Sequence, residues 1–383
     1  MELNGKQKAV GWDLVKLASC CSKITDGTHD TPRVVNSGRP FFTAIHVKEN
    51  GIDYDNCLYL SEDDHRTIYQ RCNPVRDDIL MVNIGAGVCT TAIVEVDYEF
   101  SIKNVALLKP DRSLVCSKFL DQVIKFNRET IVKSLTNGGA QPFLGLGQIG
   151  ELSFVLPLNK KEQEAIANAL SDADAYIESL EKLITKKRLI KKGVMQELLT
   201  GRRRLEGYTD NWVVKSLGSV AELYQPQTIS ANMFTESGFP VYGANGIVGF
   251  YNQANHTSWQ VTVTCRGSTC GTVNKTVEKC WITGNAMVVN SNSDIDRQFL
   301  FYKLSSISLQ DCITGTGQPQ IVRGPLAAVN LEIPTDKNEQ IQIGNILADA
   351  DNEIFILETK LNKARLIKQG MMQELLTGRI RLV

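Results

Sequence analysis

Residues 157–205 read PLNKKEQEAIANALSDADAYIESLEKLITKKRLIKKGVMQELLTGRRRL, and residues 334–382 read PTDKNEQIQIGNILADADNEIFILETKLNKARLIKQGMMQELLTGRIRL. The two segments align without a gap, and about 29 of their 49 positions are identical. Internal repetition of this kind indicates that the chain consists of two related halves joined head to tail. Two copies are too few for a solenoid, so we expect a pseudo-twofold protein.

Each copy has the apolar pattern of one long helix. Apolar residues step alternately by four and three positions, which is the seam of a coiled coil. The first copy's seam consists of Ile166, Leu170, Ala173, Ile177, Leu180 and Ile184, and the second copy repeats it. Further along, the seam becomes mixed, because Lys187, Lys191 and Lys368 fall on it. About 40 residues, each with a rise of 1.5 Å, predict rods of about 60 Å.

Both helices also carry start and stop signals. A polar cap with a carboxylate three residues later marks each start, as in a capping box: Asn159 with Glu162, and Asp336 with Glu339. Each helix is expected to stop at Leu-Leu-Thr-Gly, where Gly201 and Gly378 are free to adopt the left-handed conformation.

We expect the two helices to pair with each other in an antiparallel coiled coil. The first helix must lead the chain to a second domain, and the second helix must then return. Matching seams of equal length in the same chain favour this pairing. Packing of a helix on a globular domain alone, and dimerisation with a second chain, are the alternatives.

The composition limits the function classes. With 383 residues and 43% hydrophobic content, the chain is long enough for two or three domains with real cores. The formal net charge is zero, so the chain has no strong overall field, although basic residues gather in residues 182–204. The ten cysteines and four histidines have no metal-ligand spacing, and no apolar run reaches the ~18 residues of a membrane span. We expect free thiols, no metal or cofactor, and a cytoplasmic location.

Two tryptophan-led segments, WDLVKLASC from Trp12 and WVVKSLGSV from Trp212, each appear at the opening of a globular domain. The predicted order is domain 1 over residues 1–156, a helical spacer over 157–207, domain 2 over 208–333 and a second helical spacer over 334–383. Both domains are expected to mix strands and helices, which makes the fold class α+β. Predicted strands flank glycine turns at residues 79–84, 92–96, 260–265 and 287–289, and short helices are predicted at 117–126 and 296–304.

No catalytic pattern is convincing in this chain. It lacks a GxxxxGK[ST] phosphate loop, a Gly-x-Ser-x-Gly elbow and a dinucleotide fingerprint. Asn73-Pro74 is not followed by the aromatic residue that a base-methylating pocket needs to stack a flipped base. We therefore expect a binding protein without catalytic activity.

The repeated LIK-x-G-x-MQELLTG element, a helical spacer after each of two dissimilar domains, and the Trp-led domain openings resemble the specificity subunit of a type I restriction–modification system. The resemblance covers nearly the whole chain. It implies two target recognition domains that each read one half of a bipartite, asymmetric DNA site, with the helices setting the spacing. It also implies double-stranded DNA, methyltransferase subunits and motor–nuclease restriction subunits as partners, with the adenine methylation and the ATP-dependent cleavage carried out by those partners.

Base readout needs Arg, Asn, Gln, Ser or Thr on exposed loops. The candidates for DNA contact are Gln141, Gln318, Gln320, Arg266, Ser268, Tyr242 and Asn245, with Thr28, Arg33, Asn83 and Thr90 as further candidates in domain 1. Structural readings stay open: Gln-Pro as a turn before a strand, Arg266 with Ser268 as a surface turn, and Asn245-Gly246 as a hairpin turn chosen for positive φ. His29 is interpreted as structural.

Contacts with partner proteins are expected on the outer faces of the helices. The candidates for methyltransferase docking are Lys186, Arg188, Met195, Lys363, Arg365 and Met372, and the alternative is a plain solvated helix face. Two other functions remain open: a protein-binding scaffold with a coiled-coil ruler, which would leave no footprint on DNA, and an unrecognised methyltransferase or nuclease, which would modify or cut DNA by itself.

Overall fold

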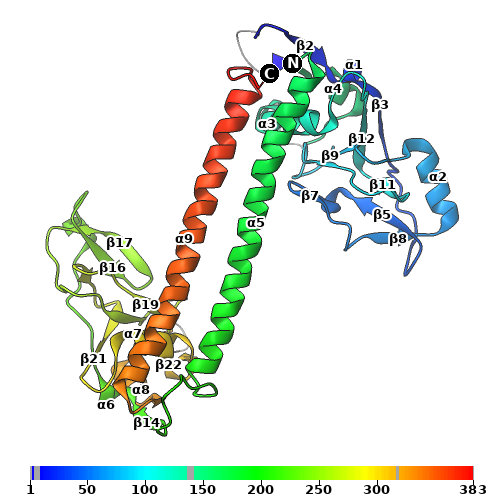
Figure 1. Ribbon diagram of the computed structural model, residues 1–383. Coiled ribbons are helices and arrows are strands. Elements are labelled where there is room, and N and C mark those ends of the chain that lie inside the picture. Colours follow the sequence, from blue (N-terminus) through cyan, green and yellow to red (C-terminus); the bar gives the residue numbers. More distant parts are fainter. Residues whose placement is uncertain (1, 4–8, 136–141, 316–318, 383) are drawn as a thin grey trace. The chain divides into compact units, whose positions relative to one another are not determined.

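The computed structural model describes residues 2–3, 9–135, 142–315 and 319–382 (Figure 1). The chain forms two compact units. Unit 1 comprises residues 1–179 and 361–383, and unit 2 comprises residues 180–360. We call the part of unit 1 from β2 to β13 domain 1, and the part of unit 2 from β14 to β24 domain 2.

The described part of domain 1 contains short strands, four α-helices and the 3-10 helix η1. Its elements, together with the preceding β1 (Glu2–Leu3), are β2 (Trp12–Lys16), α1 (Leu17–Cys20), β3 (Cys21–Asp26), β4 (Val34–Val35), β5 (Arg39–Thr43), η1 (Ala44–His46), β6 (Val47–Lys48), β7 (Gly51–Ile52), β8 (Leu58–Leu60), α2 (Glu62–Cys72), β9 (Ile79–Val82), β10 (Thr91–Ile93), β11 (Ser101–Lys103), β12 (Val105–Pro110), α3 (Ser117–Leu135), α4 (Leu146–Glu151) and β13 (Ser153–Pro157). The central sheet has the order β10-β9-β12-β3, and a second sheet has the order β11-β5-β8-β4.

Domain 2 follows the same plan with fewer elements. They are β14 (Val213–Ser216), α6 (Leu217–Val220), β15 (Ala221–Tyr224), η2 (Ala231–Met233), β16 (Phe239–Gly243), β17 (Gly246–Tyr251), β18 (Val261–Thr264), β19 (Val273–Lys275), β20 (Trp281–Ile282), β21 (Ala286–Ser291), α7 (Arg297–Ser305), η3 (Gln310–Cys312), β22 (Ile313–Thr314), β23 (Gln320–Ile321), α8 (Arg323–Ala327) and β24 (Asn330–Ile333). The central sheet is β15-β21-β18-β19, and a second sheet is β17-β16-β20. Read from its other edge, the central sheet matches that of domain 1, with β19, β18, β21 and β15 in the places of β10, β9, β12 and β3.

Strand β9 is apolar at every position because both faces of the sheet are covered there. In β9, Ile79 and Met81 belong to the core shared with α3, while Leu80 and Val82 belong to the core shared with the second sheet. Successive side chains of a strand point to opposite faces, so a strand between two cores has no polar face. Strand β18 of domain 2 is also buried at every position, although threonines alternate with its valines.

The two repeat segments form the helices α5 (Lys160–Leu198) and α9 (Lys337–Leu375), each 39 residues long. In each unit, ion pairs join the two repeat segments. Residues later in the first segment pair with residues earlier in the second segment. The pairs are Arg381–Glu162 and Lys368–Asp174 at 2.6 Å in unit 1, and Lys187–Glu353 at 2.6 Å, Lys191–Asp351 and Arg204–Glu339 at 2.7 Å in unit 2. The segments are therefore antiparallel in both units, and the lysines on the seam are ion-paired with the other helix.

The predicted helix ends are confirmed, with one correction. Gly201 and Gly378 have φ values of +68° and +70°, and a tryptophan lies against each of them, so both helices stop in the left-handed conformation as expected. At the helix starts, Asn159 and Asp336 cap backbone N–H groups two residues on.

The carboxylates of the two predicted capping boxes do not turn back to the helix start. Glu162 is fully buried and is bound by Arg381, and Glu339 is 1% exposed and is bound by Arg204 through two hydrogen bonds of 2.7 and 2.8 Å. A buried carboxylate needs a cation, and that requirement outweighs the backbone N–H of the cap. The capping-box prediction is therefore half wrong: the polar cap is present, and the carboxylate serves the other helix.

Two short helices were predicted, and one is longer than expected. Asp296 caps the helix that follows it by accepting a hydrogen bond from the Phe299 N–H, and α7 begins at the next residue. Helix α3 continues nine residues past its predicted end, because Asn127 and Ile131 carry its buried face onward through a polar stretch. Within the described residues, no helix is both long and apolar enough to span a membrane, and all ten cysteines are free thiols.

Candidate nucleic-acid interface

In domain 1, several loops meet at one end of the central sheet. Val82, the last residue of β9, pairs with Val105, the first residue of β12. Asp26, the last residue of β3, pairs with Ala106 of β12. The register therefore places the β9–β10 loop (residues 83–90), the β3–β4 loop (residues 27–33) and Asn104 at the same sheet end. Loops that converge in this way are a common place for binding residues.

The register of domain 2 produces the same gathering. Thr264 at the end of β18 pairs with Ala286 at the start of β21, and Tyr224 at the end of β15 pairs with Val288. The β18–β19 loop (residues 265–272) and the segment after β15 therefore share one sheet end. The side chain of Gln225 donates to the Gly284 carbonyl at 2.9 Å and links the segment after β15 to the turn before β21.

The β9–β10 and β18–β19 loops, which we call the glycine loops, have the same backbone hydrogen bonds. Within the loops, Val88 N–H donates to Gly85 O as Cys270 N–H donates to Gly267 O, each at 3.0 Å. Toward a later segment of each domain, Gly85 N–H donates to Pro142 O as Gly267 N–H donates to Pro319 O, and Leu144 N–H donates to Asn83 O as Ile321 N–H donates to Cys265 O. Gly85 and Gly267 have φ values of +91° and +89°. The two domains thus hold one loop geometry with two different sequences.

Three of the predicted DNA-contact residues of domain 2 lie together, two on its glycine loop and one on the neighbouring β23. Arg266 and Gln320 form an isolated antiparallel bridge, and both side chains are exposed. Ser268 is exposed two residues beyond Arg266. Gln320 lies 54 residues after Arg266 in the sequence, and the fold brings it beside Arg266.

Of the two predicted hairpin residues, Asn245 is exposed and Tyr242 is buried. Asn245 is exposed in the two-residue connection between β16 and β17, next to Gly246 at φ +94°, so the hairpin reading of Asn245-Gly246 is correct. The Thr264 hydroxyl donates to the Ala244 carbonyl and holds this turn near the glycine loop. Tyr242 is 8% exposed, and its hydroxyl accepts the Val277 N–H, so it lies in the domain core and away from a readout position.

In domain 1, two of the predicted DNA-contact residues are at least partly exposed and two are buried. Arg33 is exposed and Thr28 half-buried on the β3–β4 loop. Asn83 and Thr90 are only 2% and 8% exposed at the two ends of the glycine loop, where the tight turn directs them inward. Gln141 and Gln318 lie outside the described residues. His29 stands between Asp26 and Asn104, with its ring nitrogens 2.8 and 3.2 Å from their side chains, in keeping with its structural reading.

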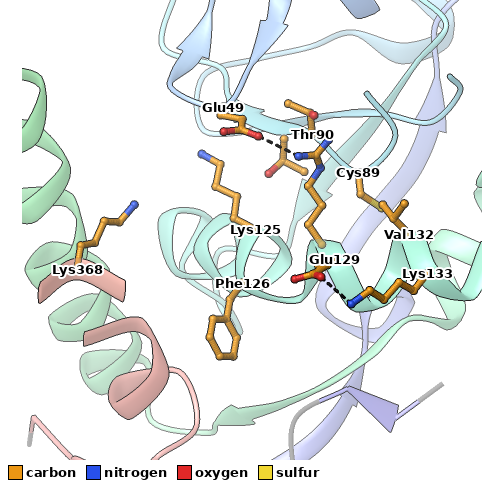
Figure 2. A pocket seen from close by; sticks show the side chains of 11 residues that line it. Glu49, Cys89, Thr90, Lys125, Phe126, Glu129, Val132, Lys133 and Lys368 are labelled. Carbon is orange, nitrogen blue, oxygen red and sulfur yellow. Dashed lines mark hydrogen bonds and ion pairs between the residues drawn. The ribbon is translucent and has the colours of Figure 1, made fainter. Parts of the chain in front are cut away.

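A cavity of about 580 Å³ lies beside the glycine loop of domain 1, and both basic and acidic side chains line it. Figure 2 shows Cys89 and Thr90 of the loop on one side, and Lys125, Glu129 and Lys133 of α3 on the other. Each basic side chain has an acidic partner: Arg128 with Glu49, Lys133 with Glu129, Lys125 with Asp121, and Lys368 with Asp174. The charges therefore compensate one another, and the cavity is not a strong anion site.

Two cysteines of the glycine loops could be mistaken for nucleophiles. Burial raises the pKa of the Cys89 thiol, and that of the Cys265 thiol, to about 11 in each case. Both thiols are therefore neutral at physiological pH, whereas a reactive cysteine is a thiolate. Among the described residues, no group of three or more His, Cys, Asp or Glu side chains could hold a metal ion.

The predicted partner-binding residues of the helices are also divided. Lys186, Arg188, Lys363 and Arg365 are exposed, and Arg188 is paired with Glu358 at 2.5 Å. Met195 and Met372 are half-buried and pack against the cores of units 2 and 1, so their outward role is not supported. The sequence reasoning passed over the apolar residues off the seam: Leu189 and Ile190 on α5 are 65% and 50% exposed, and Leu366 and Ile367 on α9 are 68% and 53% exposed.

Residues 209–365 match the family model described as the type I restriction modification DNA specificity domain. The EcoprrI type I specificity subunit of Escherichia coli is 28% identical over 36% of this chain and 35% of its own length. The MjaVIII type I specificity subunit of Methanocaldococcus jannaschii is 25% identical over 69% of this chain and 72% of its own length. A candidate MjaX type I specificity subunit of the same organism is 24% identical over 99% of this chain and 97% of its own length.

A solved structure has a similar fold. The S subunit of a type I restriction-modification system from M. genitalium is 18% identical and aligns over 98% of this chain and 99% of its own length, with a TM-score of 0.69. The predicted mixed fold is therefore confirmed for the whole chain. Residues 209–365 therefore match a type I restriction modification DNA specificity domain, and the chain is similar to type I specificity subunits over nearly its whole length.

Proposed function

We propose that this chain is the non-catalytic, DNA-reading subunit of a type I restriction–modification complex. Domain 1 reads one half of a bipartite, asymmetric DNA site and domain 2 reads the other half. Helices α5 and α9 set the distance between the halves and dock the methyltransferase subunits. Adenine methylation belongs to those subunits, and ATP-dependent cleavage belongs to the restriction subunits.

The observation that carries the proposal is the duplicated glycine loop. The two loops share their backbone hydrogen bonds and differ in their exposed side chains. A shared geometry with different outward side chains suits two readers of unlike sequences, since base edges are distinguished by side-chain chemistry. A protein-binding scaffold has no need to keep one loop geometry in two domains while changing what the loop presents.

The helices support the spacing and docking parts of the proposal. Each has 39 residues, which corresponds to about 58 Å at 1.5 Å per residue. Half-sites one helical turn apart are about 34–36 Å from centre to centre, within reach of such a helix pair. The exposed pairs Leu189–Ile190 and Leu366–Ile367 occupy equivalent positions of the two repeats. Equivalent apolar pairs suit two identical partner subunits, one for each repeat.

The charge of the chain bears on its affinity for DNA. The net charge is zero, and phosphate neutralisation dominates nonspecific DNA affinity. The isolated chain should therefore bind DNA weakly and lose binding as salt rises, with tighter binding once the methyltransferase subunits are added. Tight binding by the isolated chain at physiological salt would contradict this.

Methylation-aware sequencing of the source DNA, with and without this gene, tests the proposal. We expect a bipartite methylated adenine motif that disappears when the gene is deleted. An unchanged methylome together with no DNA footprint from the assembled complex would favour the scaffold. Methylation or cleavage by the purified chain alone would favour an enzyme.

The ruler can be tested separately by matched insertions of one helical turn in both α5 and α9. Four residues add about 6 Å to each helix. We expect the same two half-sites with a longer spacer between them. A complex that remains active with an unchanged spacer would reject the ruler.

A further inference from the structure

We infer that the two domains read DNA by different chemistry. In domain 1, Ile84 and Phe143 contact the C5-methyl groups of thymines in the major groove. In domain 2, Arg266 and Gln320 bind the hydrogen-bonding edges of purines. The inference rests on the proposed function, because it requires DNA to lie across the glycine loops, and it adds the residues and the base groups that make each half-site specific.

The residues correspond because the two loops share one geometry. Ile84 precedes Gly85 in domain 1 as Arg266 precedes Gly267 in domain 2. Ile84 forms an isolated antiparallel bridge with Phe143, and Arg266 forms the same bridge with Gln320. The hydrogen bonds on either side of the bridge also match. Each loop therefore presents a pair of adjacent side chains from the same two backbone positions.

The chemistry of the two pairs is opposite. In domain 1, Ile84 is 39% exposed and Phe143 is 52% exposed. In domain 2 the same positions hold an arginine and a glutamine, both exposed. Ala86 and Ser268 continue the contrast two residues further along the loops. Domain 1 thus exposes apolar side chains at positions where domain 2 exposes polar ones. This difference indicates that the ligand of domain 1 has an apolar group.

The remaining polar groups of the domain 1 loop are turned away from the surface. Asn83 and Thr90 are 2% and 8% exposed. The loop itself is held from behind, since Arg128 of α3 donates to the Val88 carbonyl at 3.2 Å. Hydrogen-bond readout by this loop is therefore limited, and its outward surface is mainly that of Ile84, Ala86 and Phe143.

The major groove of DNA offers one apolar feature, the thymine methyl group, which apolar side chains contact. Arginine pairs with the O6 and N7 acceptors of guanine, and glutamine pairs with the N6 and N7 groups of adenine. A protein partner is the other possible occupant for Ile84 and Phe143. The matched positions in domain 2 favour DNA, because arginine and glutamine are the side chains that read bases.

The experiment uses the full chain assembled with its methyltransferase subunits and duplexes that contain the methylated motif. Replacing thymine by deoxyuridine in one half-site at a time removes methyl groups and leaves base pairing intact. We expect a loss of affinity of roughly fourfold per contacted methyl in one half-site and less than twofold in the other. Replacing purines by 7-deazapurines should give the reverse pattern, with roughly tenfold loss in the second half-site.

Variants assign the half-sites to the domains. The double variant Ile84→Ala, Phe143→Ala should abolish the deoxyuridine effect and leave the 7-deazapurine effect intact. Arg266→Ala should do the converse. Leu58→Ala is the matched control, because Leu58 is 40% exposed on β8 of the other sheet of domain 1 and should change neither effect.

The outcomes separate this inference from the proposed function. If the complex has no bipartite motif, the proposed function fails. If the motif exists but deoxyuridine has no effect, or the half-site assigned to domain 1 has only G·C pairs, the inference alone fails. If the double variant of domain 1 blocks binding of methyltransferase subunits and leaves half-site preference unchanged, this surface is a protein interface and the inference is overturned.

Discussion

The two helices and the two domains preserve their duplication in different ways. The helices keep both sequence and contacts, since the ion pair Arg381–Glu162 recurs as Arg204–Glu339, and Lys368–Asp174 recurs as Lys191–Asp351. The domains keep the order of their central sheets and the hydrogen bonds of their glycine loops, while most side chains differ. The side chains of these ion pairs are the same in both repeats, where they contact the other helix. Only the backbone is the same where each domain exposes different side chains.

The two repeats each place an equivalent leucine in a core, and replacing these leucines is the strongest test of this comparison. Leu170 and Leu347 are equivalent residues, each fully buried, one in the core of unit 1 and one in the core of unit 2. Leu170→Ala and Leu347→Ala should each lower the free energy of unfolding by about 3 kcal/mol, through lost transfer energy and a cavity. Urea unfolding followed by circular dichroism measures both changes. Effects that differ severalfold would mean that the repeats are alike in sequence but not in packing.

The arginine–carboxylate pairs give a smaller and more specific test. Arg381→Ala and Arg204→Ala each leave a carboxylate with 0–1% exposure without its cation, and such a loss is destabilising. Both variants should lower the urea midpoint by similar amounts. Arg379→Ala is the control, because its pair with Glu374 is exposed and should contribute little. If the urea midpoint of either variant is no lower than that of the control, its arginine does not stabilise the buried carboxylate.

Replacing the two capping glycines should lower the stability of the chain by slightly different amounts. Gly201→Ala and Gly378→Ala both force a side chain into the left-handed region, at a cost of about 1–2 kcal/mol. A Cβ at Gly378 would meet Trp12 at 3.1 Å, whereas a Cβ at Gly201 would meet Trp212 at 3.4 Å. The Gly378 variant should therefore be the less stable of the two in thermal unfolding. The reverse order would show that the tryptophan contact is not limiting.

The glycine loops can be compared through their thiols. The pKa of Cys89 and that of Cys265 are raised by burial from 9.0 to about 11 in the folded chain. Above pH 9 the unfolded chain loses these protons and the folded chain keeps them, so stability should fall as the pH rises from 9 to about 11. Cys89→Ala and Cys265→Ala should each reduce this loss in urea unfolding at pH 8 and pH 10. An unchanged pH dependence in either variant would show that its thiol is not protected.

Much of the fold was accessible from the sequence because its signals are local. The seam, the glycine stops and the tryptophan-led openings each lie within one stretch of chain, and the structure agrees with them. The partner of Glu162 could not be predicted, since Arg381 is brought to it by tertiary structure alone.

The candidate site was harder to predict for the same reason. Residue type identified Arg266, Ser268 and Gln320, but it also suggested Asn83, Thr90 and Tyr242, which the turns and the sheet bury. Ile84 and Phe143 were missed because apolar residues in a sequence are read as core residues. Aligning the two glycine loops with each other is the signal that would have found them.

The most direct test of the account is a chain in which residues 12–157 replace residues 212–334, so that both positions carry domain 1. The duplicated chain is assembled with the methyltransferase subunits, and the methylated motif is determined by sequencing. Because the helices are antiparallel repeats of one another, the account predicts an inverted repeat of the domain 1 half-site with the original spacer. A folded and assembled complex that still methylates the asymmetric motif, or whose two half-sites are unrelated, would contradict it.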